Sequence, residues 1–141
     1  MSGVMTGAQA LDFASRFFHG QDQLRGTFPP ELLAPAYKAD IVGFPTMDAA
    51  GHNQFGAAWY DAFQDMAHTL DEVRPTDTGM VVRFTANGRH TGSFVGIPAT
   101  NRTISASAMV LLTIEGGKVK QLSAIFDQFG LMRQLGVVPG G

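Results

Sequence analysis

Residues 103–127, TISASAMVLLTIEGGKVKQLSAIFD, carry the strongest structural signal in the chain. Two runs rich in β-branched and other apolar residues flank Gly116 and Gly117. Adjacent glycines supply the positive φ angles that a two-residue hairpin turn requires. The stretch therefore predicts an antiparallel hairpin with strands at 103–115 and 118–127.

The turn also predicts the register of this hairpin. If the turn has two residues, Glu115 pairs with Lys118, and counting along both strands places Ala106 opposite Asp127. Cross-strand partners share a face of a sheet. The face that carries Asp127 is otherwise apolar along the first strand, with Ile104, Ala106, Ala108, Val110, Leu112 and Ile114.

Small side chains on this face predict a cavity. Ala106, Ala108 and Ser123 are too short to fill the space beneath a covering helix, so we expect them, with Val110, to line an apolar substrate pocket. A carboxylate at Asp127 would lose hydration there, which raises its proton affinity toward the range useful for acid–base chemistry. Two alternatives stay open. Asp127 caps the chain that follows the strand, or a one-residue bulge turns it to the other face.

The opposite face of the hairpin is too apolar at its centre for a wet surface. It carries Ser105, Ser107, Met109, Leu111, Thr113, Leu122, Ala124 and Phe126. Burial against a second subunit would explain this composition, so we expect a dimer or tetramer formed through this face. The alternative is that another element of the same chain covers it.

The rest of the chain predicts helices before strands. Thr6 can cap a helix that continues to about Phe18 and ends at Gly20, and a short helical turn is expected within 28–35. An extended segment at 39–44 precedes a helix at 53–70, and strands are expected at 71–74 and 80–88. This order favours one α+β domain over residues 1–141, in which N-terminal helices and a curved, mostly antiparallel sheet enclose an apolar pocket.

The composition excludes several classes of function. The chain has 141 residues, 45% of them hydrophobic, a formal charge of −2 and no cysteine. The charge gives no basic footprint for nucleic acid, and the lack of cysteine excludes disulfides and thiolate chemistry. No His-x-x-x-His pair or carboxylate–histidine cluster supports a metal site. No apolar run approaches a membrane span and the N-terminus is a poor signal peptide, so we expect a cytoplasmic protein with no membrane partner.

Four further side chains are candidates for the pocket. His90 alternates with inward positions of its strand, so it either faces the pocket mouth or holds the following loop by donating to a backbone carbonyl. Trp59 and Phe63 are expected in the pocket wall or the core, and Tyr37 offers a hydroxyl from a loop. The other polar helix positions are expected to serve capping or to be solvated: His19, His52, Asn53, His68, Asp12, Asp61 and Asp65.

Two segments resemble the SnoaL-like polyketide cyclase family. They are residues 88–102, GRHTGSFVGIPATNR, and residues 126–136, FDQFGLMRQLG. The resemblance implies the cone-shaped fold of the nuclear transport factor 2 and ketosteroid isomerase group. It also implies an intramolecular aldol ring closure in which a pocket aspartate, here Asp127, is general acid and base, with no metal, flavin or nicotinamide. Ser123 stands where the family often has tryptophan, and Val110 where a polar group is common, which leaves the expected pocket roomier.

Three functional hypotheses follow. The first is a cyclase-type acid–base enzyme that acts on an apolar, carbonyl-bearing small molecule without a cofactor. The second is an isomerase or epoxide hydrolase on the same fold, which would need further hydrogen-bonding groups in the pocket. The third is a dimeric protein that binds a hydrophobic ligand without catalysis, with Asp127 as a polar tether.

Overall fold

The computed structural model describes residues 4–138 as five strands and three α-helices with one 3₁₀ turn. The elements in chain order are α1 (Gly7–Gln23), η1 (Pro30–Leu32), β1 (Leu33–Ile41), α2 (Ala49–Ala62), β2 (Phe63–Pro75), β3 (Gly79–His90), β4 (Thr103–Glu115), β5 (Lys118–Phe126) and α3 (Gln128–Gln134). The strands form a single sheet in the order β1-β5-β4-β3-β2. Strand β1 runs parallel to β5, and all other neighbours are antiparallel.

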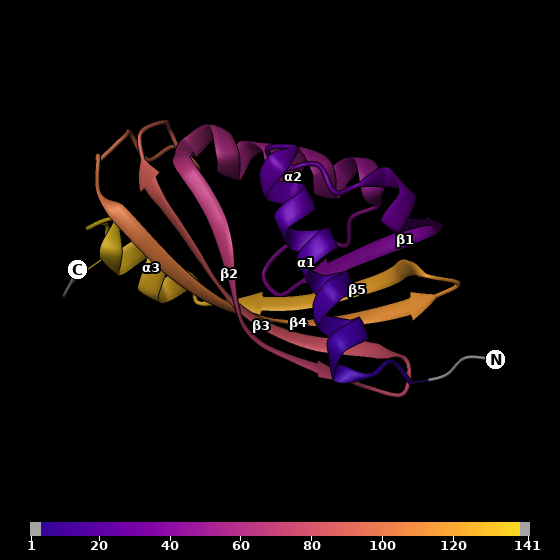
Figure 1. Cartoon of the computed structure of the whole chain (residues 1–141). Helices are drawn as coiled ribbons and strands as arrows, with labels where there is room; N and C mark the ends of the chain where they lie inside the picture. The colour runs from indigo at the N-terminus through magenta and orange to yellow at the C-terminus, as the bar shows by residue number, and fades with distance from the viewer. Residues whose placement is uncertain (1–3, 139–141) are drawn as a thin grey trace.

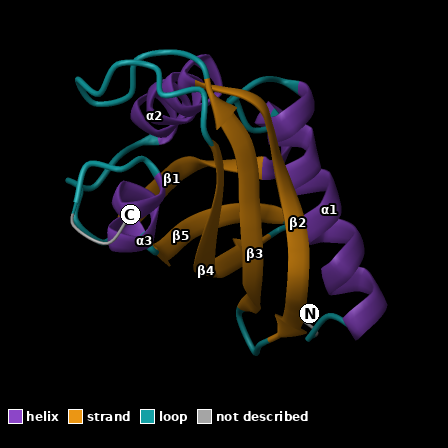
Figure 2. Cartoon of the chain, turned by 90° about the vertical axis from the view of Figure 1, so that its left-hand side faces the viewer, coloured by secondary structure: helices purple, strands orange, loops and turns teal. Residues whose placement is uncertain are grey.

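The sheet is strongly curved, and two helices cover its concave side (Figure 1). Helix α1 lies along β2, and α2 lies across one end of the sheet (Figure 2). The predicted α+β architecture with a curved, mostly antiparallel sheet is therefore confirmed. Helix α3, which the sequence analysis did not predict, lies at the opposite end of the sheet from the β4–β5 turn (Figure 1). No helix within residues 4–138 combines the length and apolar character needed to span a bilayer.

Helix α1 begins as predicted but ends later. Thr6 is its N-cap, and its hydroxyl accepts from the backbone N–H of Gln9 while the Gln9 side chain accepts from that of Thr6. The helix continues through Gly20 to Gln23, so the predicted end at Gly20 is wrong. Gly20 serves packing instead, because a Cβ at this position would lie 2.5 Å from Cγ of Pro29.

The predicted helix at 53–70 is wrong in its second half. Helix α2 begins at Ala49 with Asp48 as N-cap and ends at Ala62. From Phe63 the chain is extended and pairs with β3 as far as Pro75. Pairing along a whole neighbouring strand outweighed the helical spacing of the aromatic residues, which is the usual way that tertiary context overrides a local pattern. His68 therefore lies in a strand and not on a solvated helix.

The segment before α2 is more regular than predicted. The expected helical turn within 28–35 shortens to η1, and β1 begins at Leu33, well before the expected extended segment at 39–44. Tyr37 consequently lies in β1 and is 2% exposed, whereas the sequence placed it in a loop. Pairing with β5 explains the strand, because β1 obtains its hydrogen bonds from a partner more than 80 residues away.

The β4–β5 hairpin has the predicted turn but not the predicted register. Gly116 and Gly117 have positive φ angles, and Glu115 pairs with Lys118 as expected. Ile114 pairs with Val119, but Thr113 then pairs with Gln121, so one additional residue of β5 forms a bulge. Every later pair is displaced by one, down to Ala108 with Phe126.

The bulge exchanges the two faces of β5. Leu122, Ala124 and Phe126, predicted on the outer face, line the interior, whereas Ser123 and Ile125 lie on the outer face. Along β4 the prediction is correct, with Ile104, Ala106, Ala108, Val110 and Leu112 buried. The side-chain period of a strand is two, so one inserted residue is enough to reverse every position beyond it.

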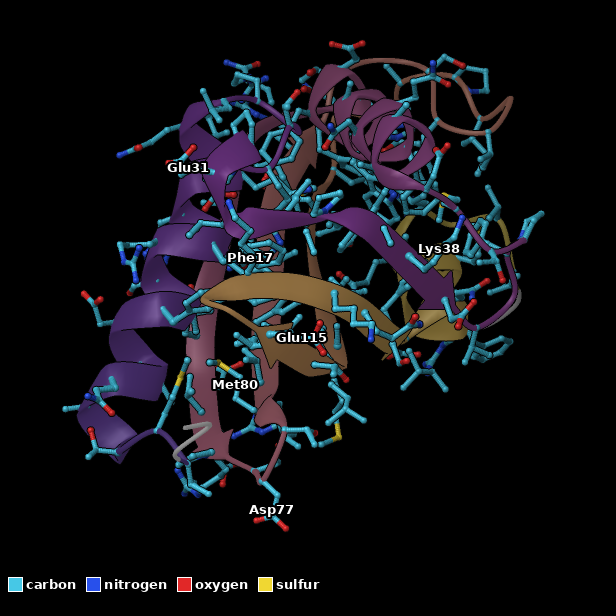
Figure 3. All side chains as sticks on the ribbon, turned by 90° about the vertical axis from the view of Figure 1, so that its right-hand side faces the viewer. Phe17, Glu31, Lys38, Asp77, Met80 and Glu115 are labelled. Atoms are coloured by element: carbon cyan, nitrogen blue, oxygen red, sulfur yellow. The ribbon has the colours of Figure 1, made fainter. Side chains whose placement is uncertain are left out.

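Two apolar clusters fill the space under the helices. One lies between α1 and the sheet, where Phe17 stacks on Phe28 with ring centroids 4.1 Å apart. Phe17 and Met80, labelled in Figure 3, are both fully buried in this cluster. The other lies around Phe63, Ile104 and Leu131, and includes α3. Residues of both clusters line one apolar cavity between the helices and the sheet.

Candidate active site

An apolar cavity of about 110 Å³ lies between the helices and the sheet. Its sheet wall is made largely of small side chains, contributed by Ala86, Ala106, Ala108, Val110 and Ala124. Three of these, Ala106, Ala108 and Val110, were predicted to line a pocket, and the structure places them there. The helix wall is aromatic, with Phe18, Phe55 and Trp59.

The polar side chains of the cavity lie on the side of the helices and of β2. They are Gln21, His52, Tyr60 and His68. The amide nitrogen of Gln21 donates to the carbonyl of Gly26, which fixes the turn that follows α1. The other three belong to two hydrogen-bonded groups with different electrostatics.

The first group joins α1, α2 and β2 through Asp22. Nδ1–H of His68 donates to Oδ1 of Asp22 at 2.7 Å, and the Tyr60 hydroxyl donates to the same oxygen at 2.5 Å. Oδ2 of Asp22 accepts the backbone N–H of His68 at 2.9 Å. The side chains of His68 and Asp22 are only 9% and 15% exposed. Both carboxylate oxygens are therefore held, and the imidazole orientation is fixed.

The environment keeps Asp22 ionised. Burial alone would raise its pKa, but the hydrogen bonds and electrostatic attraction of the His68 ring, with the bond from Tyr60, outweigh burial and hold the pKa below its ordinary value. Burial, and then the neighbouring carboxylate, raise the pKa of the Tyr60 phenol well above its ordinary value. Tyr60 thus stays a neutral donor to Asp22.

The second group contains no charge. Nδ1 of His52 on α2 and the hydroxyl of Tyr37 on β1 are 2.7 Å apart, and both rings are buried. Burial lowers the pKa of His52 to about 4 and raises that of Tyr37 far above its ordinary value. His52 is therefore a neutral imidazole near neutral pH. The prediction that it serves helix capping is wrong, because Asp48 is the cap.

The other predicted pocket residues lie in different places. Trp59 lines the cavity, whereas Phe63 and His90 lie in the buried layer beside it, with ring centroids 5.2 Å apart. Nδ1 of His90 accepts the backbone N–H of Thr100 at 3.1 Å, so His90 holds the loop at 91–102 as an acceptor and not as the expected donor. Ser123 borders a groove on the outer face.

Asp127 lies outside the cavity, contrary to the prediction from the hairpin. It is the N-cap of α3, and its Oδ1 accepts the backbone N–H of Gly130 at 2.8 Å. Its own N–H donates to the carbonyl of Ser107, and the side chain is exposed on the outer side of the sheet. The bulge in β5 is the physical reason, since it turns the end of the strand over. The catalytic role of Asp127 stays a prediction.

Sequence reasoning missed Asp22, Tyr60, His68 and His52 as cavity or site residues. Asp22 lies beyond the predicted end of the first helix, and His68 lies in the segment predicted as helix. No local motif joins them, because Asp22 and His68 are 46 residues apart in sequence. Within residues 4–138, no group of three or more His, Asp or Glu side chains is arranged to hold a metal ion.

Helices packed into the concave side of a curved five-stranded sheet, around an apolar cavity, form the cone of the nuclear transport factor 2-like proteins. The model of the SnoaL-like polyketide cyclase family matches residues 10–135, and the chain belongs to that family.

Named relatives agree with this assignment. The chain is 38% identical over 91 residues to the aklanonic acid methyl ester cyclase of Streptomyces peucetius. This match covers 61% of this chain and 62% of the relative. It is 35% identical over 80 residues to the nogalonic acid methyl ester cyclase of Streptomyces nogalater. This match covers 55% of this chain and 60% of the relative. The matches thus span less than two thirds of these cyclases.

Two solved structures share the fold over nearly the whole chain. AclR of Streptomyces galilaeus superposes with a TM-score of 0.85 at 16% identity, over 95% of this chain and 89% of that one. IdmH of Streptomyces antibioticus superposes with a TM-score of 0.76 at 23% identity, over 92% of this chain and 99% of that one. At these identities the likeness concerns the fold alone.

Proposed function

We propose that this protein is a cyclase-type enzyme that performs acid–base chemistry on an apolar, carbonyl-bearing small molecule, without a cofactor. The observation that carries the proposal is an apolar cavity that two imidazole side chains, His52 and His68, line together with small side chains of the sheet. Such a site binds a flat hydrophobic molecule and offers it groups that exchange protons. Membership of the cyclase family supports an intramolecular aldol ring closure as the reaction.

The substrate class that we propose is a polyketide methyl ester, because the relatives above are named for such compounds. The cavity of about 110 Å³ is smaller than the roughly 300 Å³ at which ligand pockets typically begin. We therefore expect the reacting side chain of the ester to enter the cavity, with the remaining rings at its mouth.

The test is turnover of aklanonic and nogalonic acid methyl esters by the purified protein. Ring closure leaves the elemental composition unchanged, so the product is an isomer of the ester with the same mass. Chromatography separates the two isomers. We expect conversion well above the rate of the ester in buffer alone. Conversion of neither ester above that rate would contradict the proposed activity.

A hydrophobic carrier is the second candidate, favoured by the almost wholly apolar sheet wall of the cavity. A carrier would retain a hydrophobic ligand through purification. It would also bind both esters without converting them. Mass spectrometry of the extracted protein, read together with the turnover assay, separates the two functions.

We further propose that the protein self-associates through the outer face of the sheet. Large apolar side chains are exposed there: Val42 at 58%, Met109 at 51%, Leu111 at 44% and Ile125 at 53%. A patch of this kind is typical of an interface. Light scattering should show a dimer or larger oligomer for the wild type and a smaller species for Ile125→Lys, and a monomeric wild type would refute the proposal. The cytoplasmic location also stays a prediction, which cell fractionation would test.

A further inference from the structure

We propose that His68, held by Asp22, is the catalytic base of this protein. The assignment rests on the proposed function and identifies the group that removes the proton. It differs from the prediction that Asp127 has this role.

The first support is the position of His68. It lines the cavity from β2, where it pairs with Ala86, one of the small residues of the sheet wall. Its Nδ1 is bound to Asp22, and no hydrogen bond to its Nε2 occurs within residues 4–138. Of the two ring nitrogens, Nε2 is therefore the one available to a ligand.

The hydrogen bonds also fix the tautomer. An ionised carboxylate only accepts hydrogen bonds, so Nδ1 of His68 carries the proton that lies between it and Asp22. The neutral imidazole then has its lone pair on Nε2, which is the form that a general base requires. This is the role that a buried aspartate has toward the histidine of a serine-protease triad.

Comparison of the two cavity histidines selects His68 over His52. When a histidine takes up a proton it becomes a cation, and a buried cation is stable only beside a negative charge. Asp22 provides this charge for His68, whereas the partner of His52 is the neutral hydroxyl of Tyr37. Burial lowers the pKa of His52 to about 4, which shows the cost of a charge at that position.

The proton transfers of ring closure can then be written in full. Nε2 of His68 takes a proton from the carbon beside a carbonyl, and the electron pair of that C–H bond forms the enolate. The enolate carbon attacks a second carbonyl carbon, a C–C bond forms and the carbonyl oxygen becomes an alkoxide. The imidazolium, stabilised by Asp22, returns the proton to that oxygen. No oxidant, metal or co-reactant is consumed.

A purely structural role is the competing explanation, since the group ties the end of α1 to β2. The substitution that separates the two is His68→Asn. The asparagine amide can donate to Asp22 from nearly the position of Nδ1, but nothing replaces Nε2. A matched control is His19→Asn, which removes an exposed histidine of α1 whose ring hydrogen-bonds to the backbone carbonyl of His68.

We expect His68→Asn to lower kcat on the ester roughly 10²- to 10⁴-fold, the usual contribution of a general base, with KM changed less than about threefold. The acidic limb of the pH–rate profile should disappear in this variant.

The other ionisable groups near His68 are Asp22 and His19 on α1 and Tyr60 on α2, with Arg25 stacked on the Tyr60 ring. A folded His68→Asn variant that keeps kcat within threefold overturns the assignment, as does loss of activity in Asp127→Asn with activity retained in His68→Asn.

The base assignment can also be tested if wild type converts neither ester. The unconverted nogalonic acid methyl ester then serves as a carbonyl-bearing probe, with binding followed by Trp59 fluorescence. Nitrogen-15 spectra of the histidines should show Nδ1–H and an unprotonated Nε2 for His68, and the probe should shift the Nε2 signal. A tautomer with the proton on Nε2 would overturn the assignment independently of turnover. So would a probe that does not bind, or one that binds and leaves the Nε2 signal unchanged.

Discussion

Acidification from pH 7.5 to about pH 4.5 should destabilise this protein through His52. Burial lowers the pKa of this histidine to about 4 in the folded protein, from an ordinary value of 6.5. Between these values the unfolded chain binds a proton that the native state does not, so stability is complete above pH 6.5 and falls as the pH drops toward 4. With 1.36 kcal/mol for each pKa unit, the loss at about pH 4.5 is about 2–3 kcal/mol.

Urea unfolding at the two pH values measures this loss. Trp59 is the single tryptophan and lines the cavity, so its fluorescence follows the transition. The variant His52→Gln removes the buried imidazole, and the difference in unfolding free energy between the two pH values should shrink by about 2–3 kcal/mol. Asp22 does not interfere, because its lowered pKa causes a loss of stability only below about 3.8.

The control is His19→Gln, which removes a histidine whose ring is exposed and should keep the wild-type pH dependence. An equal loss of stability in wild type and His52→Gln on acidification would refute the reasoning. In that case His52 would take up its proton in the native state, which requires water or a negative charge beside the ring.

Two further predictions concern Asp127 and the cavity. Asp127→Ala removes the N-cap of α3 and should lower the free energy of unfolding by about 1 kcal/mol, whereas Asp127→Asn should lower it by only a few tenths of a kcal/mol. Thermal denaturation measures both effects. Equal stability of the alanine variant and the wild type would contradict a stabilising role of the cap. Ala108→Phe places a large ring in the cavity and should weaken binding of the ester, whose side chain enters the cavity, at least about tenfold, as read by Trp59 fluorescence. Unchanged affinity in a folded Ala108→Phe protein would mean that the ester binds elsewhere.

Sequence patterns alone predicted the elements whose signals are local. The Thr6 cap, the paired glycines of the last turn and the alternation along 103–115 each depend on residues close together in the chain. The α+β class and the apolar sheet wall follow from these signals. The family motifs at 88–102 and 126–136 added the cone and the expected chemistry.

The identity of the ionisable groups in the cavity depends on long-range packing and strand pairing. The bulge in β5 turned Asp127 outward, and pairing with β3 drew His68 out of a predicted helix. Asp22 and His68 meet because α1 packs on β2, although 46 residues separate them in the chain. One inserted residue reverses the face to which each later side chain of a strand points, and a long-range contact leaves no local pattern in the sequence. Residue spacing could therefore predict neither the orientation of Asp127 nor the contact between Asp22 and His68.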